Sequence, residues 1–152
     1  MRLRELNLDD AEAVQRIYSG SSVRHLDRPT MNRAEANTYV AQAVALAAEQ
    51  PPRLLIFGID LDSDLIGVIK LDTIDNTGRL SYILREDTWN RGYATRAVAD
   101  LLAHAFGVLQ LPSIRARHRV DNLASGKVLV RAGFIYTYTV DGLVNYLVRQ
   151  PS

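Results

Sequence analysis

Three short apolar segments in the middle of the chain constrain its fold more than any other feature. They span residues 54–59, 65–71 and 80–84, and two clusters of turn-forming residues separate them, Asp62-Ser63-Asp64 and Asp75-Asn76-Thr77-Gly78. Apolar runs of this length between turn residues are typical of strands. The pattern therefore predicts an antiparallel meander of three strands.

The chain then changes to helical character and back to extended character. Residues 114–120 predict a strand, and residues 95–108 predict a helix whose apolar side chains recur on one face, namely Val98, Leu101, Leu102, Ala105 and Phe106. A strand, a helix and a strand in this order imply a crossover connection that makes the two strands parallel. Together with the meander, this connection predicts a mixed sheet.

Two helices are predicted in the first third of the chain. Asp9 and Glu12 have the spacing of a capping box at the start of the first helix. Asn32 and Glu35 repeat this spacing at the start of the second helix. Proline lacks the backbone N–H that a helix interior needs, so we expect Pro51-Pro52 to end the second helix.

Further elements are predicted at both ends of the chain. Residues 2–6 predict a strand, and residues 123–131 predict a short helix that ends at Gly133, because glycine easily adopts the left-handed conformation of a helix C-terminus. Asp141-Gly142 is a strong signal for a tight hairpin between two last strands. The elements together predict one α+β domain over residues 1–152, with a mixed sheet of about seven strands and about four helices.

The charge balance argues against a nucleic-acid partner. Eighteen basic and seventeen acidic side chains give a formal net charge of +1, so the chain has no general field to hold a phosphate backbone. Arg115, Arg117 and Arg119 occupy alternate positions of a predicted strand, where they form either a small site for an anionic ligand or a solvated strand face. His118 is expected on the opposite face, as a core histidine or a cleft residue.

Other classes are excluded by what the sequence lacks. It contains no cysteine, which removes thiolate zinc sites and a cysteine nucleophile, and we expect no metal. No apolar run approaches the ~20 residues that span a bilayer, and residues 1–10 lack the apolar core of a signal peptide. The sequence therefore predicts a cytoplasmic protein without a membrane partner.

One segment combines the features of a site for an anionic ligand. Residues 81–97 pass from a strand through a loop into a helix, with the small residues Gly92 and Ala94 at the helix start. Small residues let a ligand approach the backbone, and the free N–H groups of the first helical turn suit a pyrophosphate. The chain has neither a Walker loop nor a G-x-G-x-x-G turn, so the phosphate site is of another kind. Taken alone, the segment is equally compatible with an ordinary strand-to-helix connection.

The segment and two downstream motifs resemble a known family. Trp89-Asn-Arg-Gly-Tyr-Ala94, followed by Thr95 and an amphipathic helix, resembles the pyrophosphate loop of the GNAT acetyltransferase superfamily. Asn122-Leu-Ala-Ser125 and Arg131-Ala-Gly-Phe134 resemble motifs of the Rim-type branch, which acetylates the N-termini of ribosomal proteins. Trp89 departs from the superfamily pattern, which often has Gln or Arg at that position. The resemblance covers essentially the whole chain and is strongest over residues 80–134.

The resemblance implies a GNAT-like fold with a cleft for acetyl-CoA. Strands 80–84 and 114–120 would splay apart, and their unpaired edges could bind the amides of pantetheine as an added strand would. The implied pantetheine residues are Tyr82, Ile83 and Leu84. The implied pyrophosphate residues are Asn90, Arg91, Gly92, Tyr93, Ala94 and Thr95. Asn122 would contact the cofactor, although a plain helix N-cap explains this residue type equally well.

The resemblance also implies an N-acetyltransferase that transfers acetyl from acetyl-CoA to a primary amine by direct attack. The acceptor would be a peptide N-terminus or a small amine. Many relatives use a tyrosine as the acid for the departing thiolate, but Leu129 occupies that position here. In the Rim-type branch the motif serine lies near the thioester sulfur, so Ser125 is the catalytic candidate implied for hydrogen bonding or acid assistance. As a residue in a helix start, Ser125 could equally be only a polar surface residue.

The sequence does not identify one residue as the general base. Many superfamily members carry a glutamate early on the strand before the cofactor loop, but the matching stretch Thr77-Gly78-Arg79-Leu80 contains no acid. The candidates are Glu86 and Asp87 after the strand, Asp72 and Asp75 before it, and the two histidines His25 and His118. The missing base also leaves room for a domain that binds acetyl-CoA as a sensor without turnover. Residues 19–30 are expected to border the acceptor site, and a homodimer is one oligomeric state that the resemblance implies.

Overall fold

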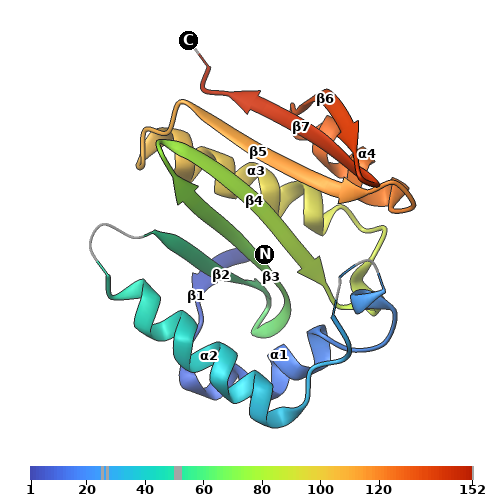
Figure 1. Ribbon diagram of the computed structural model, residues 1–152. Helices are drawn as coiled ribbons and strands as arrows, with labels where there is room; N and C mark the ends of the chain where they lie inside the picture. Colours follow the sequence, from blue (N-terminus) through green and yellow to red (C-terminus); the bar gives the residue numbers. More distant parts are fainter. Residues whose placement is uncertain (25, 27, 50–52, 152) are drawn as a thin grey trace.

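One β-sheet of seven strands organises the structure, a computed structural model that describes residues 1–24, 26, 28–49 and 53–151 (Figure 1). The strands lie in the order β1-β2-β3-β4-β5-β7-β6, and within this sheet only β4 and β5 pair in parallel. The predicted mixed sheet is thus confirmed. The strands are β1 (Arg2–Glu5), β2 (Leu54–Leu61), β3 (Asp64–Ile74), β4 (Thr77–Leu84), β5 (Ser113–Arg119), β6 (Ile135–Val140) and β7 (Leu143–Arg149).

Helices cover both faces of this sheet. On one face lie α1 (Ala11–Ile17) and α2 (Arg33–Ala47), and on the other lie α3 (Tyr93–Gly107) and α4 (Leu123–Arg131). Each pair of helices packs on its own group of buried apolar side chains. Short 3₁₀-helices lie in the connections, namely η1 (Leu8–Asp10), η2 (Gly20–Val23) and η3 (Glu86–Thr88).

The alternation of side chains along β4 connects these two cores to the site. Ile83 packs in the core under α1 and α2, whereas Leu80 and Leu84 pack in the core under α3 and α4. Tyr82 lies on the same face as Leu80 and Leu84, because side chains two residues apart in a strand share a face. Tyr82 therefore points toward the sheet face that α3 and α4 cover.

The meander and the tight hairpin form as predicted. The turn between β2 and β3 places Asp62 and Ser63 at φ 50° and 72°, and the turn between β3 and β4 places Asp75 and Asn76 at φ 51° and 64°. Two successive residues with positive φ match the right-handed twist of paired strands. The β6–β7 turn repeats this geometry at Asp141-Gly142, with φ 53° and 75°.

The two parallel strands separate toward their C-terminal ends. Thr77 to Leu80 of β4 pair with Ser113 to Ala116 of β5, and the pairing stops there, although β4 continues to Leu84 and β5 to Arg119. Figure 1 shows the ends of β4 and β5 diverging in front of α3. The predicted splay of these strands is confirmed.

One predicted helix start is wrong. The capping box lies at Asn7 and Asp10 instead of Asp9 and Glu12: the Asn7 side chain accepts from the Asp9 backbone, and the Asp10 carboxylate accepts from the Asn7 N–H at 2.7 Å. The reason is that the turn η1 precedes α1, which moves the capped end toward the N-terminus. Asp10 is further fixed by the Arg4 guanidinium, at 2.9 and 3.0 Å.

Other helix boundaries agree more closely with the sequence, although α3 spans Tyr93–Gly107 where the sequence predicts 95–108. Asn32 and Glu35 form the predicted reciprocal cap, with hydrogen bonds of 2.8 and 3.0 Å. Helix α4 has the predicted bounds, and Gly133 follows it with φ 101° and donates its N–H to the Val130 carbonyl at 3.0 Å. Pro51-Pro52 lies outside the described residues.

Candidate active site

The diverging ends of β4 and β5 open into a cleft of about 690 Å³. Its walls are the end of β4, the loop before α3, the first turn of α3, the end of β5 and the exposed side of α4. The segment between α1 and α2 contributes Ser22, Arg24 and Leu26 to the rim. Residues from both sheet faces thus meet at one cavity, because the gap between the strands passes through the sheet.

Backbone N–H groups at the start of α3 face this cleft without a side-chain cap. Gly92 is the N-cap residue, in the left-handed conformation with φ 82°, and no side chain caps this end of α3. Asn90 is also left-handed, with φ 62°. A Cβ built on Gly92 would have no heavy atom within 4 Å, so the backbone there is open to a ligand. The first-turn N–H groups and the positive end of the helix dipole suit this end to an anionic ligand.

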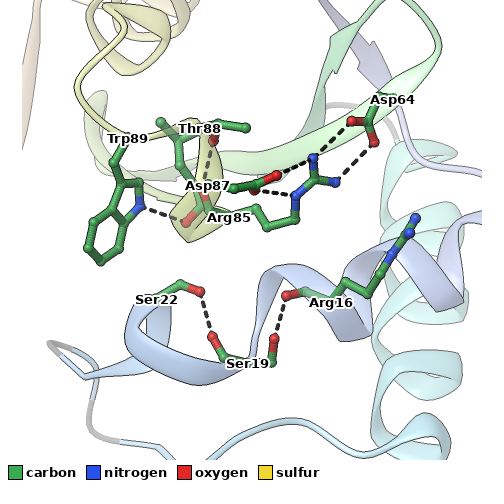
Figure 2. Close-up of polar contacts among 9 residues, drawn as sticks. Arg16, Ser19, Ser22, Asp64, Arg85, Asp87, Thr88 and Trp89 are labelled. Carbon is green, nitrogen blue, oxygen red and sulfur yellow. Dashed lines mark hydrogen bonds and ion pairs between the residues drawn. The ribbon is translucent and has the colours of Figure 1, made fainter.

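Trp89 fastens the loop to the strand before it. Its indole Nε1 donates to the Leu84 carbonyl at 3.0 Å, as Figure 2 shows, and Thr88 Oγ1 donates to the Arg85 carbonyl at 2.7 Å. These bonds hold the turn η3 against the end of β4. The tryptophan that departs from the superfamily pattern therefore has a structural role in positioning the loop.

Arg85 organises the acids beside this loop. Its guanidinium donates two bonds to Asp64, at 3.0 and 2.9 Å, and two to Asp87, at 2.6 and 3.1 Å (Figure 2). These hydrogen bonds lower the pKa of both carboxyl groups. Asp87 is thus an ion-pair partner of Arg85, and it does not line the cleft. It is poorly suited to accept a proton in the reaction.

The base candidates separate by position. Glu86 is exposed beside η2, where its Oε2 is 3.7 Å from a Cβ built on Gly20, and it does not line the cleft. Asp72 lies on β3 opposite Arg79 of β4, also outside the cleft lining. His118, the third candidate for the general base, does line the cleft.

The imidazole of His118 is held by two partners. Its Nδ1 lies 2.6 Å from the Arg119 carbonyl and its Nε2 lies 3.1 Å from the Tyr146 hydroxyl. A carbonyl only accepts, so Nδ1 carries the hydrogen and Nε2 accepts from the tyrosine. The ring lies on the strand face opposite Arg117, as predicted, and borders both the core and the cleft. Both of its nitrogens are occupied, which favours a positioning role over that of a base. The other predicted histidine, His25, lies outside the described residues.

Ser125 lies at the start of α4, across the cleft from β4. The Tyr82 hydroxyl donates to Ser125 Oγ at 3.2 Å, and the Ser125 N–H donates to Asn122 Oδ1 at 3.2 Å. Burial raises the pKa of Tyr82, which keeps its phenol protonated as a donor. The hydroxyl hydrogen of Ser125 is not used in either bond and can be donated into the cleft. The N-cap role of Asn122 is confirmed.

Most residues that the sequence implicated in cofactor binding come together here. Arg91 is the exception, since it is exposed and does not line the cavity. Sequence reasoning missed Lys127 and Arg131, which lie on the cleft side of α4 and could have been found from their spacing of one helical turn. The predicted residues in the lining are Tyr82, Ile83, Leu84, Asn90, Gly92, Tyr93, Ala94, Thr95, Asn122 and Ser125.

The described part of the chain can be compared with the requirements of a metal centre and of a membrane-spanning helix. Among the described residues, no three metal-binding side chains of the His, Asp or Glu type lie close enough together to hold an ion. No helix in the same part of the chain has the length and apolar character to cross a bilayer.

Comparison with known proteins defines the class. Residues 1–135 match the sequence model of the acetyltransferase (GNAT) domain, so the chain belongs to the GNAT acetyltransferase family. It is 28% identical over 138 residues to the uncharacterized N-acetyltransferase YoaA of Bacillus subtilis (strain 168), a match that covers 87% of this chain and 77% of YoaA.

Solved structures share the fold. RimJ of Mycobacterium smegmatis in complex with CoA-disulfide superposes with a TM-score of 0.80 at 26% identity, over 97% of this chain and 80% of that one. RimL, a ribosomal L7/L12 α-N-protein acetyltransferase in complex with coenzyme A, superposes with a TM-score of 0.83 at 19% identity, over 97% and 92%. The expected GNAT fold is confirmed.

Proposed function

We propose that this acetyltransferase uses acetyl-CoA to acetylate a primary amine, at a peptide N-terminus or on a small molecule. The observation that carries the proposal is the uncapped start of α3 at the mouth of the splayed strands. That geometry fits a pyrophosphate next to an extended arm. The complexes of RimJ and RimL with forms of coenzyme A support the same ligand.

The cleft residues divide into binding regions. Asn90 and residues 92–95 would hold the pyrophosphate through backbone N–H groups, with Arg91 between them in the same loop. Residues 82–84 present the unpaired edge of β4 to the amides of pantetheine. Lys127 and Arg131 on α4 add positive charge for the phosphates.

The amine must be neutral when it attacks the thioester. A peptide α-amine has a pKa of about 7.7–8.0, whereas a lysine side chain has about 10.4, so an α-amine near neutral pH needs little help to lose its proton. Glu86 and Asp72 lie outside the cleft lining, and both nitrogens of His118 are occupied. We infer that attack depends mainly on proximity and orientation, with water accepting the proton.

The departing thiolate needs a hydrogen-bond donor. Ser125 has an unused hydroxyl hydrogen on the cleft side, and Tyr82 supports it by donating to the same oxygen. A donor whose oxygen already accepts a bond is a stronger donor itself. We therefore assign Ser125 as the group that assists the thiolate, and Tyr82 as the residue that positions and polarises Ser125. A cytoplasmic location is a further prediction of this account.

Thiol release tests the proposal against the alternative of a sensor that binds acetyl-CoA without turnover. The protein is incubated with acetyl-CoA and a panel of α-amino peptides, free amino acids and polyamines, and free thiol is followed with a chromogenic disulfide. Amine-dependent release supports the enzyme. Tight binding of acetyl-CoA without release for any amine would support the sensor.

A further inference from the structure

The basic side chains that line the cleft do not all lie beside the proposed coenzyme A site. Among the described lining residues, Asp121 has the only acidic side chain, whereas five lining side chains are basic: Arg24, Arg117, Arg119, Lys127 and Arg131. Lys127 and Arg131 belong to α4, on the sheet face where the anion site of α3 also lies. The three arginines come from other elements, Arg117 and Arg119 from β5 and Arg24 from the segment after η2.

Arg117 lies on the opposite face of the sheet. Along β5, Ile114, Ala116 and His118 are buried, and the first two pack in the core under α3 and α4. Arg117 alternates with them and is exposed on the other side. It therefore lines the cleft from the face that carries α1 and α2.

Arg24 reaches the same mouth from the connection between α1 and α2. It directly follows η2, whose Val23 is buried in the core under α1 and α2. η2 also contacts η3, the turn that directly follows β4. In Figure 1 this connection lies beside the C-terminal end of β4. Arg24 and Arg117 thus border one opening, on the side of the sheet away from the anion site of α3.

Neither guanidinium has an ion-pair partner in the described part of the chain. A guanidinium holds a carboxylate with two parallel hydrogen bonds, and it repels a polycation. Arg119 also lines the cleft, where it has other interactions.

We propose that this opening admits the acceptor and selects primary amines that carry carboxylates close to the amino group. Arg24 and Arg117 would bind those carboxylates while the amine reaches the thioester through the gap between β4 and β5. The inference rests on the proposed function and names its substrate class. An acidic peptide N-terminus and a free acidic amino acid share this chemistry, whereas a polyamine lacks it.

The test compares acceptors in the thiol-release assay with the full chain. Three C-terminally amidated peptides share their first residue and differ in charge: Ala-Glu-Glu-Ala, Ala-Ser-Ser-Ala and Ala-Lys-Lys-Ala. Free glutamate and spermidine complete the set. We expect kcat/KM for the acidic peptide to exceed that for the neutral one by about tenfold, the difference that one charge-assisted hydrogen bond makes. The basic peptide and spermidine should be the poorest acceptors. The ratio of kcat/KM for the acidic peptide to kcat/KM for free glutamate shows whether the opening prefers a peptide N-terminus or a free amino acid.

Variants locate the effect. Arg117→Gln and Arg24→Gln should each lower kcat/KM for the acidic acceptor by about tenfold, mainly through KM, with a smaller loss for the neutral peptide. Arg115→Gln is the matched control, because Arg115 is exposed on the same strand face but does not line the cleft. In the Arg115→Gln variant, kcat/KM for the acidic acceptor should be unchanged.

The outcomes separate the two claims. Three results would overturn the inferred acceptor class: equal kcat/KM for all three peptides, a preference for spermidine, or equal losses in the Arg115 and Arg117 variants. None of them would contradict the proposed acetyltransferase activity. Absence of thiol release with every amine would contradict the proposed function and this inference together.

Discussion

The hydroxyls of Tyr82 and Ser125 lie 3.2 Å apart, so that a hydrogen bond connects the end of β4 to the start of α4 across the cleft. Tyr82 is the donor in this bond, and burial raises the pKa of its phenol. The bond leaves the hydrogen of Ser125 directed to another acceptor. Leu129, at the position where many relatives carry a tyrosine, also lines the cleft, and in our proposal the Ser125 hydroxyl is the donor to the thiolate.

Removing the serine hydroxyl tests its role directly. Ser125→Ala should lower kcat by about 100-fold, the lower end of the range for a general acid, with little change in the affinity for acetyl-CoA. Steady-state kinetics with calorimetry of cofactor binding separates the two quantities. An unchanged kcat would remove Ser125 from the mechanism.

Removing the tyrosine hydroxyl should have a smaller effect. Tyr82→Phe keeps the ring and loses one hydrogen bond of about 1 kcal/mol, which corresponds to a decrease in kcat of about fivefold. In the Ser125→Ala background the same change should have almost no effect, because the oxygen that accepts the bond is absent. Tyr138→Phe, at an exposed position of β6, is the control. Additive losses in the double variant would show that Tyr82 acts independently of Ser125.

Gly126 should be required for the packing of α4. A Cβ there would lie 2.9 Å from His118 Nε2 and 3.1 Å from Tyr146 Oη, closer than side-chain contacts normally allow. We expect Gly126→Ala to lower the free energy of unfolding by about 1–3 kcal/mol, the usual cost of overpacking, although alanine in a helix is intrinsically favourable by about 1 kcal/mol. Thermal unfolding shows whether the Gly126→Ala substitution destabilises or stabilises the protein.

Gly107→Ala is the matched control for that helix glycine. Gly107 is the last residue of α3, and a Cβ there would meet no heavy atom within 4 Å. Its substitution should be neutral or stabilising. A stabilising effect at both positions would contradict the close contact of Gly126 with His118.

Acid should weaken the network around Arg4. This guanidinium bonds Asp10 and Asp60, at 2.9 and 2.8 Å. Burial alone would raise the pKa of Asp10, but the bonds from Arg4 and the Asn7 N–H outweigh it, and the Arg4 bond lowers the pKa of Asp60. Both carboxyl groups therefore stabilise the fold at pH values above the ordinary aspartate value of 3.8. This stabilisation is lost as the pH falls through their lower folded-state values.

The matching variant is Arg4→Met, which leaves two largely buried carboxylates unpaired. We expect it to lower the free energy of unfolding by about 3 kcal/mol at pH 7, the low end of the range for breaking a buried pair. The difference from the unmodified protein should shrink below pH 3.8, measured by denaturant unfolding. Arg2→Met, at an exposed position of the same strand, should have little effect. A difference that stays constant with pH would contradict the role of the carboxylates.

Local sequence patterns predicted the fold well because each element carries its own signal. Apolar runs and the turn residues between them predict the meander, and the bounds of α4 agree residue by residue. The sequence misplaces the start of α1 because Asp9 and Asn7 are both good capping residues. Asp10 is fixed by Arg4, which is itself bound to Asp60 on β2, 56 positions away. Spacing along the chain contains no information on such a contact.

The sequence predicts those parts of the candidate site that are continuous along the chain. The family resemblance identified the loop and the strands around the cleft, since these are continuous in sequence. The pairing of Tyr82 with Ser125 joins residues 43 positions apart and depends on where β4 stops pairing with β5. The position of Asp72 outside the cleft also depends on the layout of the sheet, which no local pattern encodes.

Calorimetric titration of coenzyme A tests the central claim most directly, that the N–H groups at the start of α3 hold its diphosphate. Gly92→Glu should abolish binding, because it places bulk and negative charge at the anion site. Gly142→Glu introduces the same charge at a glycine with φ 75° and equally open surroundings, outside the cleft lining, and should bind like the unmodified protein. Equal affinity of the two variants, or no uptake of coenzyme A by the unmodified protein, would contradict the account.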